Sequence, residues 1–393
     1  KLSEASGEGA FRPRTLERVL TAYLGTVIAV AAVGFGFRGA LTNDWASALQ
    51  SAISVLIVSC PCAIGLAFPL ATELAVGSLR RSGVYARDPR IWERALAVRQ
   101  VVFDKTGTLS LETPRLTNPE ALAGLASAEQ AALAALVENN LHPFGRSLRE
   151  AMRGAGAQTA EGRLESIPGK GMAFVDTTGV RWTLGRPDWH RAAQTSAPGA
   201  QTAFCRNGEP LALFTFQEEP RPNAAEEIAA LRAQGLEVFV LSGDRPAKVA
   251  ALLQAVGLPA NAGLGDLSPE QKAAWIRQHD GGHTLMLGDG ANDALAFSEA
   301  TLRGTPVVDL SLLEQKADFY LLGRDLRGLG RLFTVARLRR RVLTEVFLFT
   351  VSYNLLVIAL SLAGLMSPLL ATLLMPASAI LTLLHVTARL RRG

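Results

Sequence analysis

The chain has 393 residues, of which 49% are hydrophobic and only 19% are charged. This composition excludes intrinsic disorder, because disordered chains are rich in charge and poor in apolar residues. Three cysteines are too few for a disulfide framework, so the composition favours a reducing or membrane setting. The formal net charge of +5 does not indicate binding to nucleic acid, because the arginines cluster beside apolar segments and form no single stripe.

Four apolar segments are the largest signal in the sequence. They comprise residues 19–37, 46–74, 342–364 and 367–387, and each reaches the roughly 18 to 20 residues that a helix needs to cross a bilayer. Buried helices of a large soluble core are the alternative, but core helices seldom remain uncharged over such lengths. The sequence therefore predicts four transmembrane helices in contact with membrane lipid.

Arginines flank these segments on one side of the predicted membrane. They lie before the first and third segments and after the second and fourth: Arg12, Arg14, Arg18, Arg80, Arg81, Arg337, Arg339, Arg340, Arg341, Arg389, Arg391 and Arg392. The turns on the other side are short and carry one basic residue between them, Arg38. By the positive-inside rule, both termini and residues 83–335 are predicted to be cytoplasmic. The expected location is the cell (inner) membrane.

Within residues 83–335, short apolar runs alternate with helical patterns. The runs predict buried strands at 98–104, 236–244, 283–290 and 305–310, and helical patterns lie at 223–234, 246–256 and 269–278. This alternation is typical of a doubly wound parallel sheet, in which the functional site lies beyond the carboxyl ends of the strands. Residues 112–215 break the alternation and predict an inserted α+β domain with a helix at 127–139.

A strand-end aspartate, Asp104, begins the sequence Asp-Lys-Thr-Gly-Thr. Such a carboxylate can attack a phosphoryl group and form an acyl phosphate, provided that a cation and hydrogen-bond donors hold the phosphate. One strand-end aspartate alone is more often a helix N-cap, but a lysine and further strand-end acids in this order favour catalysis. The expected partners are Lys105, Thr106, Ser242, Gly243, Asp244 and Lys272, with Asp289 and Asp293 joining Asp104 as ligands of Mg2+.

Three motifs, at 104–108, 242–244 and 288–293, resemble the phosphorylation domain of P-type ATPases in the haloacid dehalogenase superfamily. Soluble phosphatases of that superfamily carry a second aspartate where this chain has Thr106, so the resemblance implies a long-lived phosphoenzyme and a pump. The implied fold has four transmembrane α-helices, a cytoplasmic α/β haloacid dehalogenase-like phosphorylation domain and an inserted α+β nucleotide-binding domain. The implied domains are 1–79 (linker and first two membrane helices), 80–111 with 216–335 (phosphorylation), 112–215 (nucleotide binding) and 336–393 (last two membrane helices).

The inserted domain carries a second resemblance. His142-Pro143 resembles the His-Pro signature of the heavy-metal branch, in which the histidine helps to hold the adenine of ATP. Taken alone, a surface His-Pro or a Gly-x-Gly is usually a turn. The resemblance implies ATP and Mg2+ as cofactors and a nucleotide pocket lined by Glu138, His142, Gly169, Gly171 and Gly185.

Cys60-Pro61-Cys62 lies within the second apolar segment. Residues so spaced on an unbroken helix point about 200° apart, but proline breaks the helix, so both sulfurs can face one pocket. Two thiolates suit the soft ion Cu+ better than Zn2+, although a lone membrane cysteine is usually an apolar filler. The same motif marks the heavy-metal ATPases, and the copper-transporting branch implies further ligands at Tyr353, Asn354, Met375 and Ser378.

The leading hypothesis is an ATP-driven transporter of Cu+, with Ag+ as another soft cargo and a copper chaperone as a partner. The alternatives are a membrane-anchored phosphatase, a zinc- or cadmium-transporting member and a non-catalytic metal-binding remnant of a pump. Zinc-type members are expected to carry a lysine and an acidic residue deep in the last two spans, and neither appears there. A complete pump also has an actuator domain and earlier spans, so the chain is expected to be the C-terminal part of a longer protein. Cys205 is expected to be structural.

Overall fold

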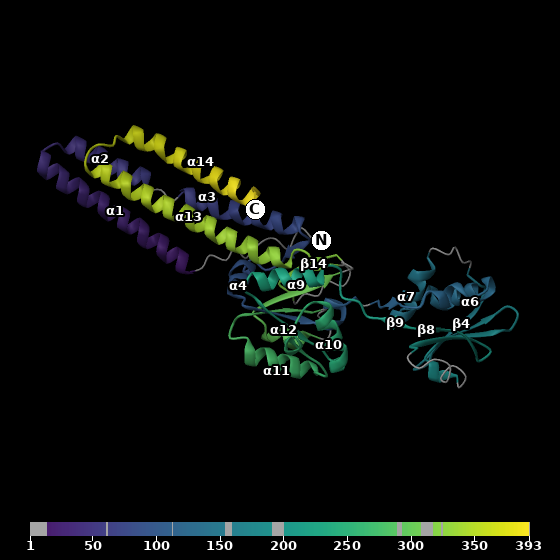
Figure 1. The fold of residues 1–393 in the computed structure, drawn as a ribbon. Helices are drawn as coiled ribbons and strands as arrows, with labels where there is room; N and C mark the ends of the chain where they lie inside the picture. The colour runs from purple at the N-terminus through teal and green to yellow at the C-terminus, as the bar shows by residue number, and fades with distance from the viewer. Residues whose placement is uncertain are drawn as a thin grey trace. The chain divides into compact units, whose positions relative to one another are not determined.

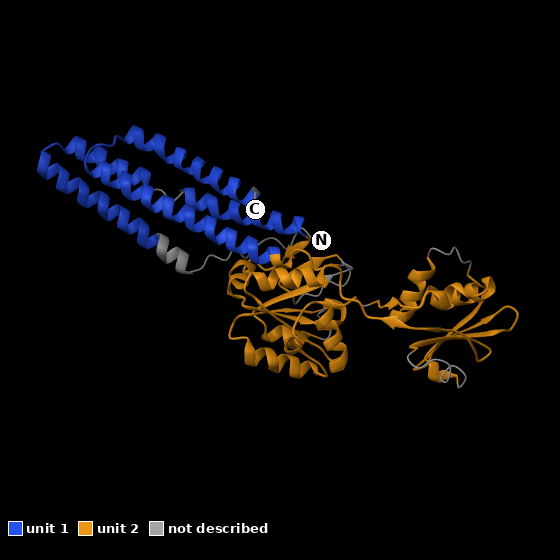
Figure 2. Cartoon of the chain, in the orientation of Figure 1, with its two compact units in different colours: residues 1–82, 331–393 blue, residues 83–330 orange. Residues whose placement is uncertain are grey.

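The computed structural model describes residues 14–59, 62–111, 113–153, 159–190, 200–288, 293–307, 317–323 and 325–392. The chain divides into two compact units, which Figure 2 colours separately. Residues 1–82 with 331–393 form the helical unit, and residues 83–330 form the α/β unit.

The helical unit consists of long apolar helices. They are α1 (Arg14–Thr42), α2 (Trp45–Val58), α3 (Cys62–Arg81), α13 (Leu329–Leu362) and α14 (Pro368–Arg392). Among the described residues, four stretches are long and apolar enough to cross a membrane: Thr21–Thr42, Trp45–Arg81, Leu329–Leu362 and Pro368–Arg391. The prediction of four membrane helices is therefore confirmed by length and composition, with α2 and α3 together forming the second.

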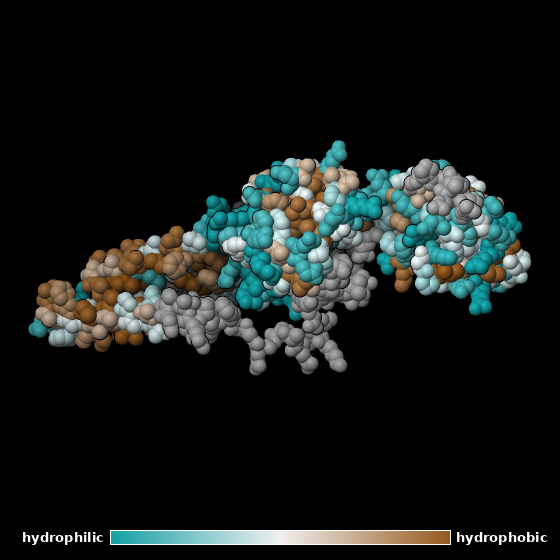
Figure 3. Space-filling model, turned by 90° about the horizontal axis from the view of Figure 1, so that it is seen from below, coloured by the Kyte–Doolittle hydropathy of each residue, from teal (hydrophilic) through white to brown (hydrophobic). Residues whose placement is uncertain are grey.

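The surface of the helical unit is apolar. Large side chains such as Leu348, Leu369 and Leu381 are 58%, 73% and 60% exposed, and Figure 3 shows the brown, hydrophobic atoms gathered on these helices. Inside the unit, α3, α13 and α14 pack through a cluster that includes Ala71, Val342 and Val386. An apolar surface around a small packed core is what contact with lipid requires.

The α/β unit is built on a seven-stranded sheet. In spatial order its strands are β1 (Val84–Ala86), β14 (Phe319–Leu322), β13 (Leu302–Val307), β12 (Thr284–Leu287), β2 (Gln100–Asp104), β10 (Glu237–Leu241) and β11 (Gly263–Leu264). All neighbouring pairs are parallel except β1 with β14. The predicted doubly wound sheet is confirmed, and the antiparallel edge is a correction. The short strands β1 and β11 have only three and two residues, too few for a periodic signal.

Helices cover both faces of this sheet, as Figure 1 shows. They are α4 (Ile91–Ala97), α9 (Ala224–Ala233), α10 (Pro246–Ala255), α11 (Pro269–His279) and α12 (Ala294–Glu299). Every residue of the interior strand β2 is buried. Val102 packs with Ile276 of α11 and Phe297 of α12, so these helices and β2 share one core. This burial on both faces explains why β2 reads as a continuous apolar run.

The inserted part lies between β2 and β10 in sequence. A two-stranded ribbon, β3 (Arg115–Leu116) with β9 (Phe216–Gln217), stands at its two ends. It contains the helices α5 (Glu120–Ala123), α6 (Ser127–Glu138) and α7 (Pro143–Met152), and the antiparallel strands β4 (Gly162–Ile167), β5 (Gly171–Asp176), β6 (Arg181–Gly185), β7 (Thr202–Arg206) and β8 (Glu209–Phe214). Leu133, Phe174 and Phe204 belong to its buried core.

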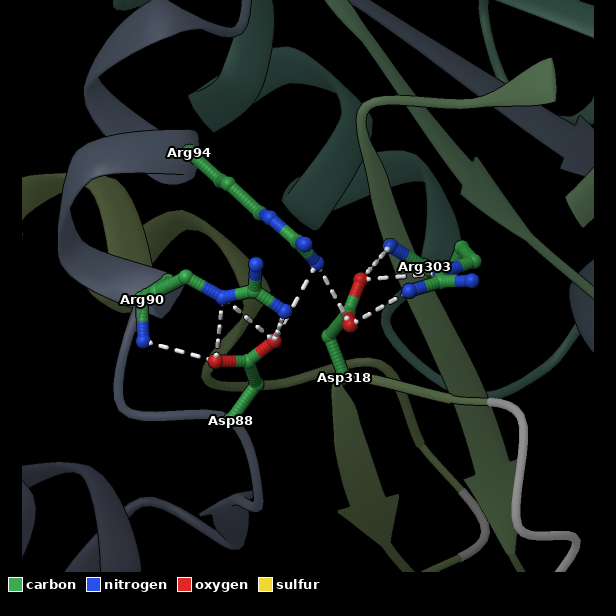
Figure 4. A network of polar contacts seen from close by, with 5 residues as sticks. All are labelled: Asp88, Arg90, Arg94, Arg303 and Asp318. Atoms are coloured by element: carbon green, nitrogen blue, oxygen red, sulfur yellow. Dashed lines mark hydrogen bonds and ion pairs between the residues drawn. The ribbon is translucent and has the colours of Figure 1, made fainter. Parts of the chain in front are cut away.

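A network of arginines and aspartates joins α4 to β13 and to the residue before β14 (Figure 4). Asp318, which is 3% exposed, accepts a hydrogen bond from Arg94 Nη1 at 2.7 Å. It also accepts hydrogen bonds from Nη2 and the backbone N–H of Arg303, both at 2.9 Å. Arg94 Nη1 lies 3.4 Å from Asp88 Oδ2, so this guanidinium lies between two carboxylates.

We expect Asp318→Ala to lower the free energy of unfolding by about 2–4 kcal/mol, because the substitution leaves two partly buried arginines without their shared carboxylate. Asp88→Ala is the matched control. Asp88 lies nearer the surface, and its loss should cost about 1 kcal/mol or less. Thermal unfolding of the full chain measures both. Equal effects of the two substitutions would contradict a central role for Asp318.

Candidate functional site

The site begins with Asp104, the last residue of the buried interior strand β2. Its neighbours β10 and β12 run parallel to it, and Asp104 is in register with Leu241 at the end of β10. The turns that follow these three strands therefore meet at one edge of the sheet. Asp104 itself is only 7% exposed.

Lys272 joins two carboxylates at this edge. It lies in the first turns of α11, which begins behind a capping box formed by Ser268 and Gln271. The Lys272 ammonium forms an ion pair with Asp104, and its Nζ lies 3.0 Å from Asp293 Oδ1. Burial opposes the charged form of Lys272, but the two carboxylates outweigh it and raise the pKa of this lysine. Lys272 therefore stays positively charged beside Asp104.

Asp293 completes the buried cluster from the turn before α12. It is 1% exposed. A Cβ atom on Gly288 would lie 2.3 Å from Asp293 Oδ2, so glycine is required there for the carboxylate to take this position. The predicted ligand Asp289 lies outside the described residues.

The donor set of this cluster fits a hard cation. Asp104 and Asp293 offer carboxylate oxygens, which Mg2+ prefers. Among the residues that the structure describes, no three His, Cys, Asp or Glu side chains are grouped closely enough to form a metal site. The two described carboxylates would therefore hold Mg2+ with further oxygen ligands from outside this group.

A second polar network surrounds Lys105, directly after Asp104. Lys105 is 2% exposed, and its ammonium pairs with Asp244 and Glu218. Thr106 Oγ1 donates to Asp244 Oδ2 at 3.4 Å, and the Asp244 N–H donates to Ser242 Oγ at 3.0 Å. Gly243 lies between these last two residues. The structure thus gathers the predicted residues after β2 and β10 and adds Glu218.

The charges in this network support one another. Burial disfavours the ammonium of Lys105, but the hydrogen bonds with Asp244 and Glu218 raise its pKa. Burial likewise opposes ionisation of Asp244, yet the hydrogen bond from Lys105 holds the pKa of Asp244 below its usual value. The network is therefore charged at neutral pH.

Arg221 was also missed by sequence reasoning. It is 3% exposed, and its Nη2 donates to the carbonyl oxygen of Gly107 at 2.5 Å. Gly107 has a φ of 73°, a conformation that favours glycine. Arg221 therefore fixes the turn that follows Asp104. The signal available in the sequence was the run Glu-Glu-Pro-Arg-Pro directly after β9.

A pocket of about 840 Å³ adjoins the Lys105 network. His142 and Phe144 line it on the side of the inserted part, and Lys105 and Lys248 line it on the side of the large sheet. His142 caps α7, where its Nδ1 accepts the N–H of Phe144 at 3.3 Å. Phe144 stacks on Phe216 with 4.5 Å between ring centroids, which gives the pocket an aromatic wall.

The predicted glycines come together elsewhere in the inserted part. Gly171 and Gly185 are register partners in β5 and β6, and Gly169 lies in the turn before β5 with a φ of 75°. A Cβ on Gly171 would lie 2.3 Å from the Leu184 carbonyl oxygen, so strand packing alone requires glycine there. Neither these glycines nor Glu138, the last residue of α6, are among the described residues that line the 840 Å³ pocket.

The helical unit contains a small cavity between its helices. Tyr353, Asn354, Met375 and Ser378, the four predicted ligands in the last two spans, all line it, together with residues that include Val58 and Ala63. Val58 ends α2 and Ala63 follows the first residue of α3. Cys60 lies outside the described residues, as does the side chain of Cys62. The described lining of the cavity thus includes one residue before and one residue after the Cys-Pro-Cys sequence.

Hydrogen bonds connect this cavity to the end of α2. Asn354 Nδ2 donates to the hydroxyl oxygen of Tyr23 at 3.1 Å, and that hydroxyl donates to the carbonyl oxygen of Ser59 at 2.8 Å. Ser378 Oγ donates to the carbonyl oxygen of Met375 at 2.8 Å. The described lining of the cavity carries no charged side chain.

Comparison with known proteins agrees with this geometry. A family model described as haloacid dehalogenase-like hydrolase matches residues 98–301, which contain Asp104, Lys272 and Asp293. The chain belongs to this family. Within it, the chain has the membrane P-type ATPase fold: a crystal structure of a zinc-transporting PIB-type ATPase aligns with a TM-score of 0.71 and 25% identity over 98% of this chain and 65% of that chain.

Relatives in sequence include a nitrogen fixation protein and a copper-exporting P-type ATPase. The nitrogen fixation protein FixI of Rhizobium leguminosarum bv. viciae is 34% identical over 390 residues, which are 97% of this chain and 50% of FixI. A copper-exporting P-type ATPase of Mycobacterium tuberculosis is 30% identical over 94% of this chain and 50% of its own length. The chain therefore spans about half the length of the curated relatives that it matches.

Proposed function

We propose that the chain serves in the ATP-driven transport of a soft monovalent metal ion, Cu+ or Ag+, across a membrane. The observation that carries this proposal is the buried cluster of Asp104, Lys272 and Asp293 at the end of the interior strand β2. A nucleophilic carboxylate held against a lysine suits phosphoryl transfer from ATP. Asp104 would become an aspartyl phosphate during each cycle.

The chemical step follows from the residues of this site. A carboxylate oxygen of Asp104 attacks the γ-phosphorus of ATP, a new P–O bond forms, and the bond to the β-phosphate oxygen breaks to release ADP. Asp104, Asp289 and Asp293 would hold Mg2+, whose positive charge would reduce the repulsion between the Asp104 carboxylate and the phosphate of ATP. Lys105 and Lys272 remain protonated because carboxylates raise their pKa, so both can stabilise phosphate oxygens. Ser242, Gly243 and Asp244 hold the adjoining turn.

The residue at position 106 argues against the phosphatase alternative. Two residues after Asp104 stands Thr106, whose hydroxyl donates to Asp244. A threonine cannot act as the general base that activates water at neutral pH. The phosphoenzyme should therefore persist long enough to be used by a pump. The intact cluster around Lys272 likewise argues against a non-catalytic remnant.

The nucleotide would occupy the inserted part. We propose that His142 holds the adenine beside Phe144, because both side chains line the pocket that also contains Lys105. Glu138, Gly169, Gly171 and Gly185 are proposed to contribute to nucleotide binding from α6 and the β5–β6 hairpin.

The metal would bind within the helical unit. Cys60 and Cys62 are proposed to supply thiolates, and Tyr353, Asn354, Met375 and Ser378 to complete the site. The small cavity that the last four line supports this assignment. The described lining holds no carboxylate or imidazole, and a site built on two thiolates favours a soft monovalent ion over the zinc named for the structural neighbour.

The placement of the chain is proposed on the same grounds. The helical unit would lie in the cell (inner) membrane with both termini and the α/β unit in the cytoplasm, where a copper chaperone could deliver the ion. The domain division into 1–79, 80–111 with 216–335, 112–215 and 336–393 is part of this proposal.

Metal-dependent phosphorylation tests the proposal. We expect ATP labelled at its γ-phosphate to label the protein in the presence of Mg2+, and Cu+ or Ag+ to increase this label several-fold above the metal-free level. Zn2+ and Cd2+ should leave it unchanged. The measurement is the acid-stable label on the full chain. Stimulation of the label by Zn2+ but not by Cu+ or Ag+ would favour the zinc-transporting alternative. Hydrolysis of a simple phosphate ester with Mg2+ but without Cu+ or Ag+ would favour the phosphatase.

A further inference from the structure

Glu218 holds two lysines together at the edge of the 840 Å³ pocket. It follows β9, at the point where the chain returns from the inserted part to the large sheet. One carboxylate oxygen pairs with the Lys105 ammonium, and the other lies 2.8 Å from Lys248 Nζ. The Lys105 side chain is 2% exposed, that of Glu218 is 38% exposed and that of Lys248 is 56% exposed. The carboxylate thus bridges a buried cation and an accessible one.

The arrangement resembles a phosphate-binding site in which the carboxylate of Glu218 takes the place of the phosphate. Two ammonium groups that share one anion are a common way to bind a polyphosphate, since each can contact a different oxygen. Both lysines line the pocket, whose aromatic wall of Phe144 and Phe216 can stack against a base. Glu218 is therefore the anion that these two ammonium groups share in the structure.

The carboxylate is charged where it lies. Burial would raise the pKa of Glu218, but hydrogen bonds from Lys105 and Lys248 hold it below the usual value. Lys105 does not depend on Glu218 alone, because Asp244 also accepts a hydrogen bond from its ammonium. Glu218 can leave Lys105 without leaving a buried charge unpaired, which makes its displacement energetically accessible.

We propose that Glu218 is an internal competitor of phosphate, which binds Lys105 and Lys248 in the nucleotide-free protein and is displaced from both by the terminal phosphates of the nucleotide. The proposal rests on the nucleotide site proposed above. It assigns Lys248 as a phosphate-positioning residue that the sequence motifs did not include. The competition lowers the affinity of the pocket for any polyphosphate by the free energy of the displaced contacts.

Replacing the carboxylate by an amide tests the competition. Glu218→Gln keeps the shape of the side chain and removes its charge, so inorganic tripolyphosphate and ATP should both bind about 3- to 10-fold more tightly. Glu219→Gln is the matched control. Glu219 lines the same pocket, but its ion pair is with Arg115 at 3.0 Å, so its substitution should change either affinity by less than about twofold.

Titration calorimetry on the full chain measures these affinities, with Mg2+ and in excess chelator. Unchanged or weaker binding of tripolyphosphate by Glu218→Gln would overturn the proposal. Equal gains in the Glu218 and Glu219 variants would also overturn it, since they would indicate a general charge effect. Weakening that appears only with Mg2+ would make Glu218 a metal ligand instead. Failure of the wild-type chain to bind ATP would refute the nucleotide site, while the tripolyphosphate comparison would still decide the role of Glu218.

Discussion

The Asp104→Asn variant should form no acid-stable phosphoenzyme from ATP and Mg2+. Asparagine fits the space of aspartate and can still accept a hydrogen bond from Lys272, but its amide is not a nucleophile toward phosphorus. The hydroxylamine-sensitive label should therefore fall by about 1,000-fold or more, while ATP binding persists. Quantifying the label on denatured protein after a short incubation provides the measurement.

Asp266→Asn is the control for this result. Asp266 lies after β11 at the same sheet and has a φ of 56°, a left-handed conformation that asparagine also adopts readily. Its backbone N–H donates to the carbonyl oxygen of Asp244, a contact that the substitution preserves. This variant should keep its label. If label instead survived in Asp104→Asn, the nucleophile would have to be another carboxylate and the proposed mechanism would fail.

The sequence predicted that the candidate site residues gather at one edge of the large sheet, and this prediction did not require the order of the strands. Asp104 and Asp244 follow apolar runs, and parallel strands bring all of their carboxyl ends to one edge. Lys272 was predicted because it lies between the motifs at 242–244 and 288–293. The capping box at Ser268 starts α11 at that edge, which places Lys272 there. The fold class was predictable because apolar runs and helical patterns alternate along residues 83–335 outside the inserted part.

Glu218 and Arg221 were not predicted because their roles come from contacts distant in sequence. The Lys105–Glu218 pair joins residues 113 positions apart, and Arg221 reaches Gly107 across 114 positions. Neither residue belongs to an apolar run or a helical period. Their proximity to Asp104 is not visible in the sequence, because the inserted part of about 100 residues separates them from Asp104 along the chain. The β3–β9 ribbon and the backbone hydrogen bond from Arg221 to the carbonyl oxygen of Leu109 bring the two segments together.

The small cavity of the helical unit illustrates a different limit of sequence-based prediction. Tyr353 and Met375 lie on separate helices, and only packing shows that both line one cavity with Asn354 and Ser378. Spacing along one helix cannot reveal which face meets a neighbouring helix in an apolar segment, because every face is apolar. The resemblance to heavy-metal ATPases, rather than periodicity, selected these four residues.

Replacing both Cys60 and Cys62 with serine should abolish high-affinity binding of Cu+. Thiolates are soft ligands, whereas a serine hydroxyl is a weak, hard one, so the affinity should fall by about 100-fold or more. Cys205→Ser is the control, because it removes the only other thiol in the sequence, a buried one in β7. Competition with a Cu+ chelator measures the affinity, and ATP binding should be unchanged in both variants. If the intact site bound Zn2+ tightly and Cu+ weakly, the copper assignment would be wrong. Cu+ binding that survived in the double variant would place the metal away from the Cys-Pro-Cys sequence altogether.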